Sequence, residues 1–471
     1  MRSGDRVPGR SSFASSEAAA PALVLAGVLI VLGWAIVVMP GPVPLVLVAG
    51  GAAAAAWTLR RSSAVYTLAL IIPYGLSYEV LGLDGVGPVD GVLLMGLVVV
   101  AVSLVEDGGS GDRFGLPLGK VLLGFWLLMV IWSSLTFLLG PANRDIFKDP
   151  VRDTWYLYRG VWRDFLVFPV VVLCLADRTA AKKALALTVI ASSLVSVYAI
   201  VLYWQTGEPA VGPFSSKNGV AGFLVLILPF AMARVILEKR LQSRLLYGCA
   251  AFIMLRALWL TASRGGLAAF LVSLTPFLLI LPPKRLLAAA MAGVLVLLVL
   301  IGVKGNVLDR PNVQRYLTLV RFSEEGNYRW RQEQWRIFMY KIAERPWLGS
   351  GSEVVEHLEM EGRLPTAHNG YLAMAMRSGI PATAAWVVLL LFLMGLSLNR
   401  SVTVESLDEK SFWIGLTGLV LAWSCHSLVD NVLLMSEAQR LFWLMVGIAL
   451  VETCQKRDIS LPNSCQPGAS R

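Results

Sequence analysis

The sequence predicts an all-α polytopic membrane protein with about 12–14 transmembrane helices and one large loop on the outer face of the membrane. Of its 471 residues, 56% are hydrophobic and only 15% are charged, whereas about a quarter of the residues in a typical soluble domain are charged. Apolar runs of about 20 residues, long enough to cross a bilayer, recur from Pro21 to Val451. Because backbone polar groups in lipid must be satisfied internally, we expect these runs to be helices.

Hydropathy divides the chain into an N-terminal helix bundle (1–303), a polar outer loop with short helices (304–367), C-terminal transmembrane helices (368–453) and a cytoplasmic tail (454–471). We expect spans near 21–39, 43–59, 64–82, 89–105, 118–139, 160–176, 184–204, 218–237, 245–262, 265–281, 286–303, 369–398, 412–431 and 436–453. A re-entrant pair at the Pro40-Gly41-Pro42 turn is the alternative for the first two spans, and it lowers the span count.

Loop charges orient these spans. Every predicted cytoplasmic loop is basic, as the positive-inside rule requires: Arg60-Arg61, Arg178/Lys182/Lys183, Lys239/Arg240/Arg244, Lys284-Arg285, Arg400/Lys410 and Lys456/Arg457. Segment 140–159 is the exception, because it is predicted outside yet carries four basic residues beside three aspartates. We interpret it as an amphipathic stretch on the outer surface. Both termini are then cytoplasmic.

The net charge of +10 does not indicate nucleic-acid binding, because the basic residues lie mostly in short loops that meet anionic membrane lipids. The five cysteines are scattered without metal-ligand spacing, and an odd number gives no disulfide framework. No cofactor and no metal site are predicted.

Polar residues within or beside membrane spans are functional candidates, because burying them is costly. The first group is Thr261-Ala262-Ser263-Arg264-Gly265-Gly266, a turn between two apolar runs. The turn is short, so Arg264 should lie at the outer membrane boundary. An arginine that extends toward water from a tight turn is the simpler alternative.

The second group opens a helix predicted from about Asn327 to Glu344, ahead of Pro346. Its apolar stripe consists of Trp335, Phe338, Met339 and Ile342, at i, i+3, i+4 and i+7. Arg331 precedes Trp335 by one turn and shares this inward face, while Arg329 and Arg336 lie on another face. A solvated charge run explains those two arginines well but explains Arg331 poorly.

The third group is Thr366-Ala367-His368-Asn369-Gly370-Tyr371, where the chain re-enters the membrane. The chain has only three histidines, and imidazole suits proton transfer near neutral pH. A histidine that bonds the backbone at a helix start is the alternative. The fourth group is His426 and Asp430, one helical turn apart near the outer surface, for which a structural pair and substrate contact are both open.

These motifs resemble the O-antigen ligase/polymerase superfamily of membrane glycosyltransferases over roughly residues 200–435. The resemblance is carried by Thr261–Gly266, by Arg331-x-x-x-Trp335, by Pro346-Trp347-Leu348-Gly349-Ser350-Gly351, by His368-Asn369-Gly370-Tyr371 with Gly379-Ile380, and by Gly212-Pro213-Phe214 with Asn218. It implies a bacterial inner-membrane enzyme whose active site faces the periplasm and takes glycans from undecaprenyl diphosphate. The acceptor would be a growing glycan, lipid A core or a protein hydroxyl, and a chain-length regulator is a further implied partner.

Carried over motif by motif, the resemblance implies that Arg264 and Arg331 bind the donor diphosphate and that His368 acts at the acceptor hydroxyl. Substrate contacts are expected from Asn218, Trp335, Asn369, His426 and Asp430. Arginine can replace a divalent metal here, because its planar fork binds phosphate oxygens bidentately and stays charged. We therefore expect metal-independent, inverting transfer in one step.

A polysaccharide-related transporter or flippase is the main alternative from another class. Its arginines would line a path through the membrane, whereas the candidates here gather at one face. The motifs fit a ligase and a polymerase equally, and the two enzymes differ in the acceptor.

Overall fold

The computed structural model describes residues 62–74, 78–80, 83–86, 88–93, 96–97, 117–139, 158, 162–214, 216–284, 326–351 and 367–454. The predicted spans at 21–39, 43–59 and 286–303 lie outside these residues, as do nearly all of segment 140–159 and of the tail from 455 onward. The helices are α3 (Ser62–Ile71), α5 (Pro117–Leu139), α7 (Arg163–Phe165), α8 (Val167–Cys174), α9 (Arg178–Thr206), α10 (Lys217–Leu237), α11 (Leu241–Leu260), α12 (Arg264–Ser273), α13 (Thr275–Ile280), α16 (Gly326–Glu344), α17 (Gly370–Thr403), α18 (Leu407–Ser427) and α19 (Ser436–Cys454), with short 3-10 turns at Ile72–Tyr74 (η1) and Val432–Leu434 (η7).

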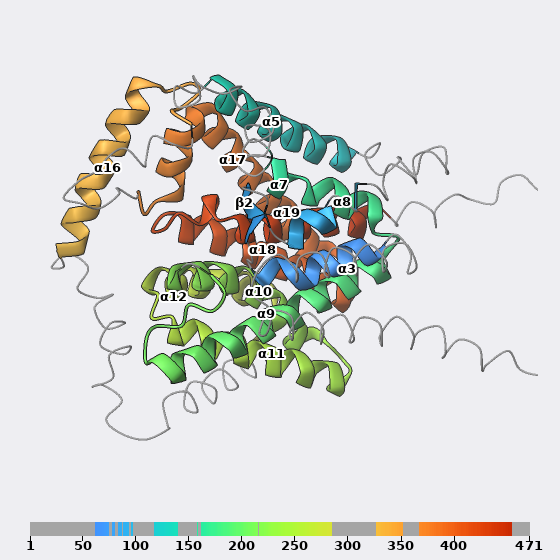
Figure 1. Cartoon of the computed structure of the whole chain (residues 1–471). Coiled ribbons are helices and arrows are strands. Elements are labelled where there is room, and N and C mark those ends of the chain that lie inside the picture. Colours follow the sequence, from blue (N-terminus) through green and yellow to red (C-terminus); the bar gives the residue numbers. More distant parts are fainter. Residues whose placement is uncertain are drawn as a thin grey trace, which may run out of the picture.

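The fold class expected from the sequence, an all-α polytopic membrane protein, is confirmed. Within the described residues, five helices are long and apolar enough to cross a membrane: α5, α9, α10, α11 and α17. The helices α18 and α19 have similar lengths and lie in the middle of the bundle (Figure 1). Protein surrounds them, so they can carry polar groups that find partners. Thr417 of α18, for example, donates to the Ser397 hydroxyl of α17 over 3.0 Å.

The expected spans differ from the structure in three places. The run predicted at 64–82 is helical only to Tyr74 and is followed by an antiparallel hairpin of β1 (Tyr78–Val80) and β2 (Leu83–Val86). The run at 265–281 is divided into α12 and α13, where Pro276 occupies the first turn of α13, the position that proline favours. The run at 160–176 is divided into α7 and α8.

Small residues allow the central helices α10 and α18 to pack closely. A side chain at Gly415 would place its Cβ 2.5 Å from the Phe230 ring, and one at Gly418 would lie 2.6 Å from Pro229. Glycine at such contacts lets helix backbones approach in a membrane, where dispersion forces and packing drive association. The helices α10 and α18 therefore form a closely packed pair at the centre of the bundle.

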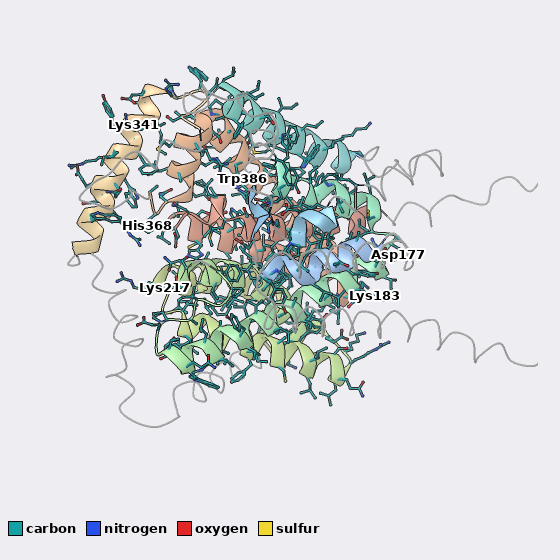
Figure 2. The ribbon with its side chains drawn as sticks, viewed as in Figure 1. Asp177, Lys183, Lys217, Lys341, His368 and Trp386 are labelled. Atoms are coloured by element: carbon teal, nitrogen blue, oxygen red, sulfur yellow. The ribbon has the colours of Figure 1, made fainter. Side chains whose placement is uncertain are left out.

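In the structure, loops predicted to be cytoplasmic and loops predicted to be outside lie at opposite ends of the helix bundle. Figure 2 shows Lys217 and His368 at the end covered by α16, and Asp177 and Lys183 at the opposite end. Ion pairs join the helices at that opposite end: Asp408 pairs with Lys182 and Arg234, and Arg178 lies 2.5 Å from Glu409. The end with α16 corresponds to the predicted outer face.

The long helix α17 is broken at Gly379, which adopts φ 83° and ψ 168°. The segment 346–351, called the strap below, packs into this break. Its amides at Ser350 and Gly351 donate to the carbonyls of Met376 (2.7 Å) and Arg377 (3.1 Å). The Trp132 indole donates to the next carbonyl, that of Ser378, over 2.9 Å. The break therefore leaves these three carbonyls bonded, as a buried backbone requires.

Candidate functional site

The turn between α11 and α12 positions Arg264. Ala262 takes a positive φ of 51°, which turns the chain sharply. Ser263 then caps α12, its hydroxyl accepting from the Gly266 amide over 3.2 Å. Arg264 is therefore the first residue of α12, at the end of the bundle covered by α16.

One pocket at this end brings together most of the residues singled out by the sequence. It has a volume of about 130 Å³, enough for more than one water molecule. The predicted site residues in its lining are Asn218 of α10, Arg264 of α12, Arg331 of α16, His426 of α18 and Asp430. We call this cavity the arginine pocket.

His426 forms the buried wall of the arginine pocket. Its side chain is fully enclosed, and it lies between two glycines: a Cβ at Gly222 or at Gly265 would come within 3.4 Å of the ring. Neither ring nitrogen has a hydrogen-bond partner among the described residues. A buried polar atom without a partner is costly, and both nitrogens are enclosed by the surrounding side chains.

His368 lies beside this pocket, on the turn before α17. Its φ of 42° is unusual for a residue other than glycine and marks a constrained position. Its Nδ1 is 3.8 Å from Oδ1 of Asp430, and its ring centroid is 5.7 Å from that of Trp330. His368 is thus placed between the carboxylate of Asp430 and α16, which carries Arg331 of the pocket lining and is called the lid helix below.

Asn369 holds this turn in place. Its side-chain oxygen accepts from the amides of Tyr371 and Leu372 and so caps α17. Its own amide donates to the side chain of Asn431 over 3.1 Å. The structure therefore gives Asn369 a positioning role next to His368.

The lid helix α16 ends at Glu344, as predicted, and presents Arg331 inward. One guanidinium nitrogen of Arg331 lies 3.4 Å from the Val429 carbonyl, whereas Arg336 is 76% exposed and pairs with Glu333. Phe338 and Ile342 are buried as expected. Met339 is 52% exposed, so its assignment to the inward stripe was wrong, because the neighbouring structure covers a narrower face than the sequence pattern suggested.

Trp335 anchors the lid and does not line the arginine pocket. Its indole nitrogen donates to the Ala367 carbonyl over 2.7 Å, directly before His368. Arg331 and His368 are thus tied to one another through α16 and the turn before α17.

The electrostatics of the site centre on Asp430, which follows the end of α18. Burial by itself would raise the pKa of its carboxyl group, but the interactions with His368 and His426 outweigh that effect and hold the pKa below its ordinary value. Asp430 is therefore a carboxylate at neutral pH.

Among the described residues, no group of three or more His, Cys, Asp or Glu side chains is placed to hold a metal ion. The carboxylates at 309, 324, 325, 353, 356, 359 and 361 lie outside those residues.

Sequence reasoning missed the glycine at 222, which makes room for His426 and stands inside an unbroken apolar run. It also missed the peptide carbonyl of Val429 as a partner of Arg331, because a main-chain group leaves no trace in a sequence.

Comparison with known protein families shows a similarity over part of the chain. A family model described as O-antigen ligase matches residues 249–387. Over these residues the chain is similar to the O-antigen ligase family. The match supports the family that the sequence motifs suggested, and it includes Arg264, Arg331 and His368. Asn218, His426 and Asp430 lie outside the matched residues but line or border the same pocket. A search of curated proteins finds no significant match.

The match to the O-antigen ligase family supports glycan transfer of the ligase or polymerase type in general, with lipid-linked glycan and acceptor substrates, by a multi-pass membrane protein.

Proposed function

We propose that this protein transfers a glycan from undecaprenyl diphosphate to an acceptor hydroxyl at the periplasmic face of the bacterial inner membrane. One observation carries the proposal. Two arginines from separate elements, α12 and α16, line one pocket, beside which a histidine and a carboxylate lie next to each other. That combination provides for the two requirements of the reaction: stabilising a leaving diphosphate and removing a hydroxyl proton.

Arg264 and Arg331 bind the diphosphate of the donor in this proposal. As the bond between the anomeric carbon and the diphosphate oxygen breaks, its electron pair passes to the diphosphate, which gains negative charge. Guanidinium groups oriented in advance, at a membrane boundary of low dielectric, stabilise that charge more than water does. His426 and Asn218 provide further polar contacts within the same pocket.

His368 accepts the proton of the acceptor hydroxyl as that oxygen attacks the anomeric carbon. Asp430 orients the imidazole and stabilises it once it is protonated, a role that requires the carboxylate form. A single displacement inverts the configuration at the anomeric carbon and forms no covalent glycosyl–enzyme intermediate. No step in this scheme requires a metal ion, since the arginines provide the positive charge.

Trp335 and Asn369 act indirectly in this proposal, by positioning Arg331 and His368. We propose that the first holds α16, and so Arg331, against the turn of His368, while the second fixes the start of α17. Their loss would misplace the reacting groups.

The proposal is tested in cells that lack the gene and are complemented with wild type, Arg264→Ala, Arg331→Ala or His368→Ala. Arg336→Ala is the matched control, because it removes an exposed arginine from the same helix as Arg331. Membrane levels of each variant are measured by blotting, surface glycan on gels, and the lipid-linked pool by extraction.

We expect the three site variants to be present in the membrane but to lose surface glycan, while undecaprenyl-linked units accumulate on the periplasmic side. Accumulated single repeats would indicate a polymerase, and accumulated long chains a ligase. Units trapped on the cytoplasmic side would point to a flippase instead. Wild-type glycan in all three variants would overturn the site.

A further inference from the structure

The segment 429–436, called the junction below, follows α18 and contacts both helices that carry the arginines of the proposed site. On the side of α12, a Cβ added at Gly265 would lie 2.7 Å from the Val429 side chain. On the side of α16, the Val429 carbonyl accepts from Arg331 over 3.4 Å. The junction therefore lies directly against the two helices whose arginines line the arginine pocket.

The turn that carries His368 packs closely on the same junction. Gly370, two residues after His368, permits this contact, because a Cβ added there would lie 3.2 Å from the Leu433 side chain and 3.3 Å from the Asp430 carbonyl oxygen. Glycine is the residue that allows backbone to approach its neighbours this closely. The turn and the junction are thus in direct contact, and a small change in one is passed to the other.

Asn431 of the junction bonds to both sides of the His368–Asp430 pair. Its main-chain amide donates to Oδ1 of Asp430 over 2.8 Å, the same oxygen that lies 3.8 Å from Nδ1 of His368. Its side-chain oxygen accepts from the main-chain amide of Asn369 over 3.1 Å, directly after His368. One residue therefore holds the carboxylate with its backbone and the turn of the histidine with its side chain.

Asn431 is itself held by the 3-10 turn η7. Its carbonyl accepts from the Leu434 amide over 3.0 Å, and the side chain of Gln439 on α19 donates to the Leu433 carbonyl of the same turn. Reacting groups keep a productive geometry when the residues that support them are fixed by hydrogen bonds of their own. The side chain of Asn431 therefore starts from a fixed backbone and can determine where its partner lies.

We propose that Asn431 is a positioning residue of the transfer reaction, and that its side-chain oxygen sets the separation and orientation of His368 and Asp430. The proposal rests on the proposed function, in which His368 takes the proton of the acceptor hydroxyl. Asn431 is not among the residues that line the arginine pocket, so it acts through His368 and not on the substrate. Misplacing a reacting group by about 1 Å can lower a rate by about a hundredfold.

The experiment measures glycan transfer by the full chain in proteoliposomes, with lipid-linked glycan and acceptor extracted from cells that lack the gene. Asn431→Ala removes the side-chain oxygen but keeps the main-chain amide that donates to Asp430. Asn431→Asp keeps an oxygen at the same position. Gln439→Leu is the matched control, because it removes a hydrogen bond from the same junction and leaves the contact between Asn431 and Asn369.

We expect Asn431→Ala to lower kcat by roughly tenfold to a hundredfold, with KM for the lipid-linked donor within about twofold of wild type. Asn431→Asp and Gln439→Leu should keep kcat within about threefold of wild type. In the His368→Ala background, adding Asn431→Ala should lower the rate no further, because a residue that acts through His368 has nothing to position once the imidazole is gone.

An equal loss of kcat in Asn431→Ala and Gln439→Leu would show a general loosening of the junction and would overturn the proposal. An equal loss in Asn431→Asp, or a further loss in the His368→Ala background, would also overturn it.

Hydrogen exchange of the peptide that contains the Asn369 amide provides a readout without turnover, and it should be faster in Asn431→Ala than in the other two variants. If this difference is present but wild type transfers no glycan, the proposed function fails, and the positioning role fails with it. If wild type and Asn431→Ala transfer glycan equally fast, the function stands and only the positioning role is overturned.

Discussion

Replacing Gly379 by alanine should detach the strap from α17. An added Cβ would lie 2.5 Å from the Trp347 carbonyl carbon and would overlap the oxygen of the same group, a clash that no small shift relieves. The backbone at φ 83° and ψ 168° is in a region essentially restricted to glycine, and a residue with a Cβ pays about 1–3 kcal/mol there.

The hydrogen bonds of the strap add to this cost. Besides the amides of Ser350 and Gly351, the Ile380 amide donates to the Pro346 carbonyl over 2.8 Å. Each such bond stabilises the fold by about 0.5–1.5 kcal/mol. We therefore expect Gly379→Ala to lose about 1–4 kcal/mol of stability, whether the strap detaches or the strain remains.

Hydrogen exchange of the purified protein, followed by mass spectrometry, reads this effect directly. The amides of 350 and 351 should exchange faster in Gly379→Ala, and the melting temperature should fall. Gly395→Ala is the control, because Gly395 lies in the same helix and a Cβ added there would meet nothing within 4 Å. This control should be neutral or gain up to about 1 kcal/mol. Equal exchange and equal melting in the two variants would refute the role assigned to the strap.

Three further predictions concern the site and the opposite end of the bundle. Asp430→Asn should keep the fold but lower glycan transfer by roughly a hundredfold, the range for a proton-transfer group; wild-type rates would exclude an orienting role for this carboxylate. Trp335→Phe keeps an aromatic ring but loses the indole N–H that donates to Ala367 together with part of the bicyclic ring, and it should increase hydrogen exchange in α16 at a cost of about 1 kcal/mol or more. Met339→Ala on the exposed face should leave exchange unchanged; the same exchange in both would contradict the anchoring contact. Asp408→Asn weakens the ion pairs at the end away from the site and should lower the melting temperature without altering the turnover of the protein that remains folded; a selective loss of turnover would show that this end also takes part in the reaction.

Much of the fold could be predicted because hydropathy reports directly on membrane helices. The expected spans at 118–139 and 218–237 agree with α5 and α10 within one residue at each end. The hairpin of β1 and β2 could not be predicted, since its residues continue an apolar run. The break at Gly379 was suggested only as part of a motif, because its geometry depends on a strap that comes from another part of the chain.

Candidate site residues could be predicted where a charged side chain, which is costly to bury, occurs on an otherwise apolar helix face. Arg331 was placed inward because it shares a helix face with Trp335 and Phe338, and the structure points it at Val429. The partnership of His368 with Asp430 was not predictable, because 62 positions separate the two in the sequence and only the fold brings them within 3.8 Å.

The central claim is that Arg331 and its partners in the arginine pocket stabilise a leaving diphosphate without a metal ion. The most direct test is the rate of undecaprenyl diphosphate release from an undecaprenyl-linked glycan in the presence of an acceptor glycan, by the full chain in proteoliposomes and with a chelator present. The account predicts unimpaired release by wild type and a rate lower by roughly a hundredfold or more in Arg331→Ala. Release that stops on chelation, or that proceeds equally in Arg331→Ala, would contradict it.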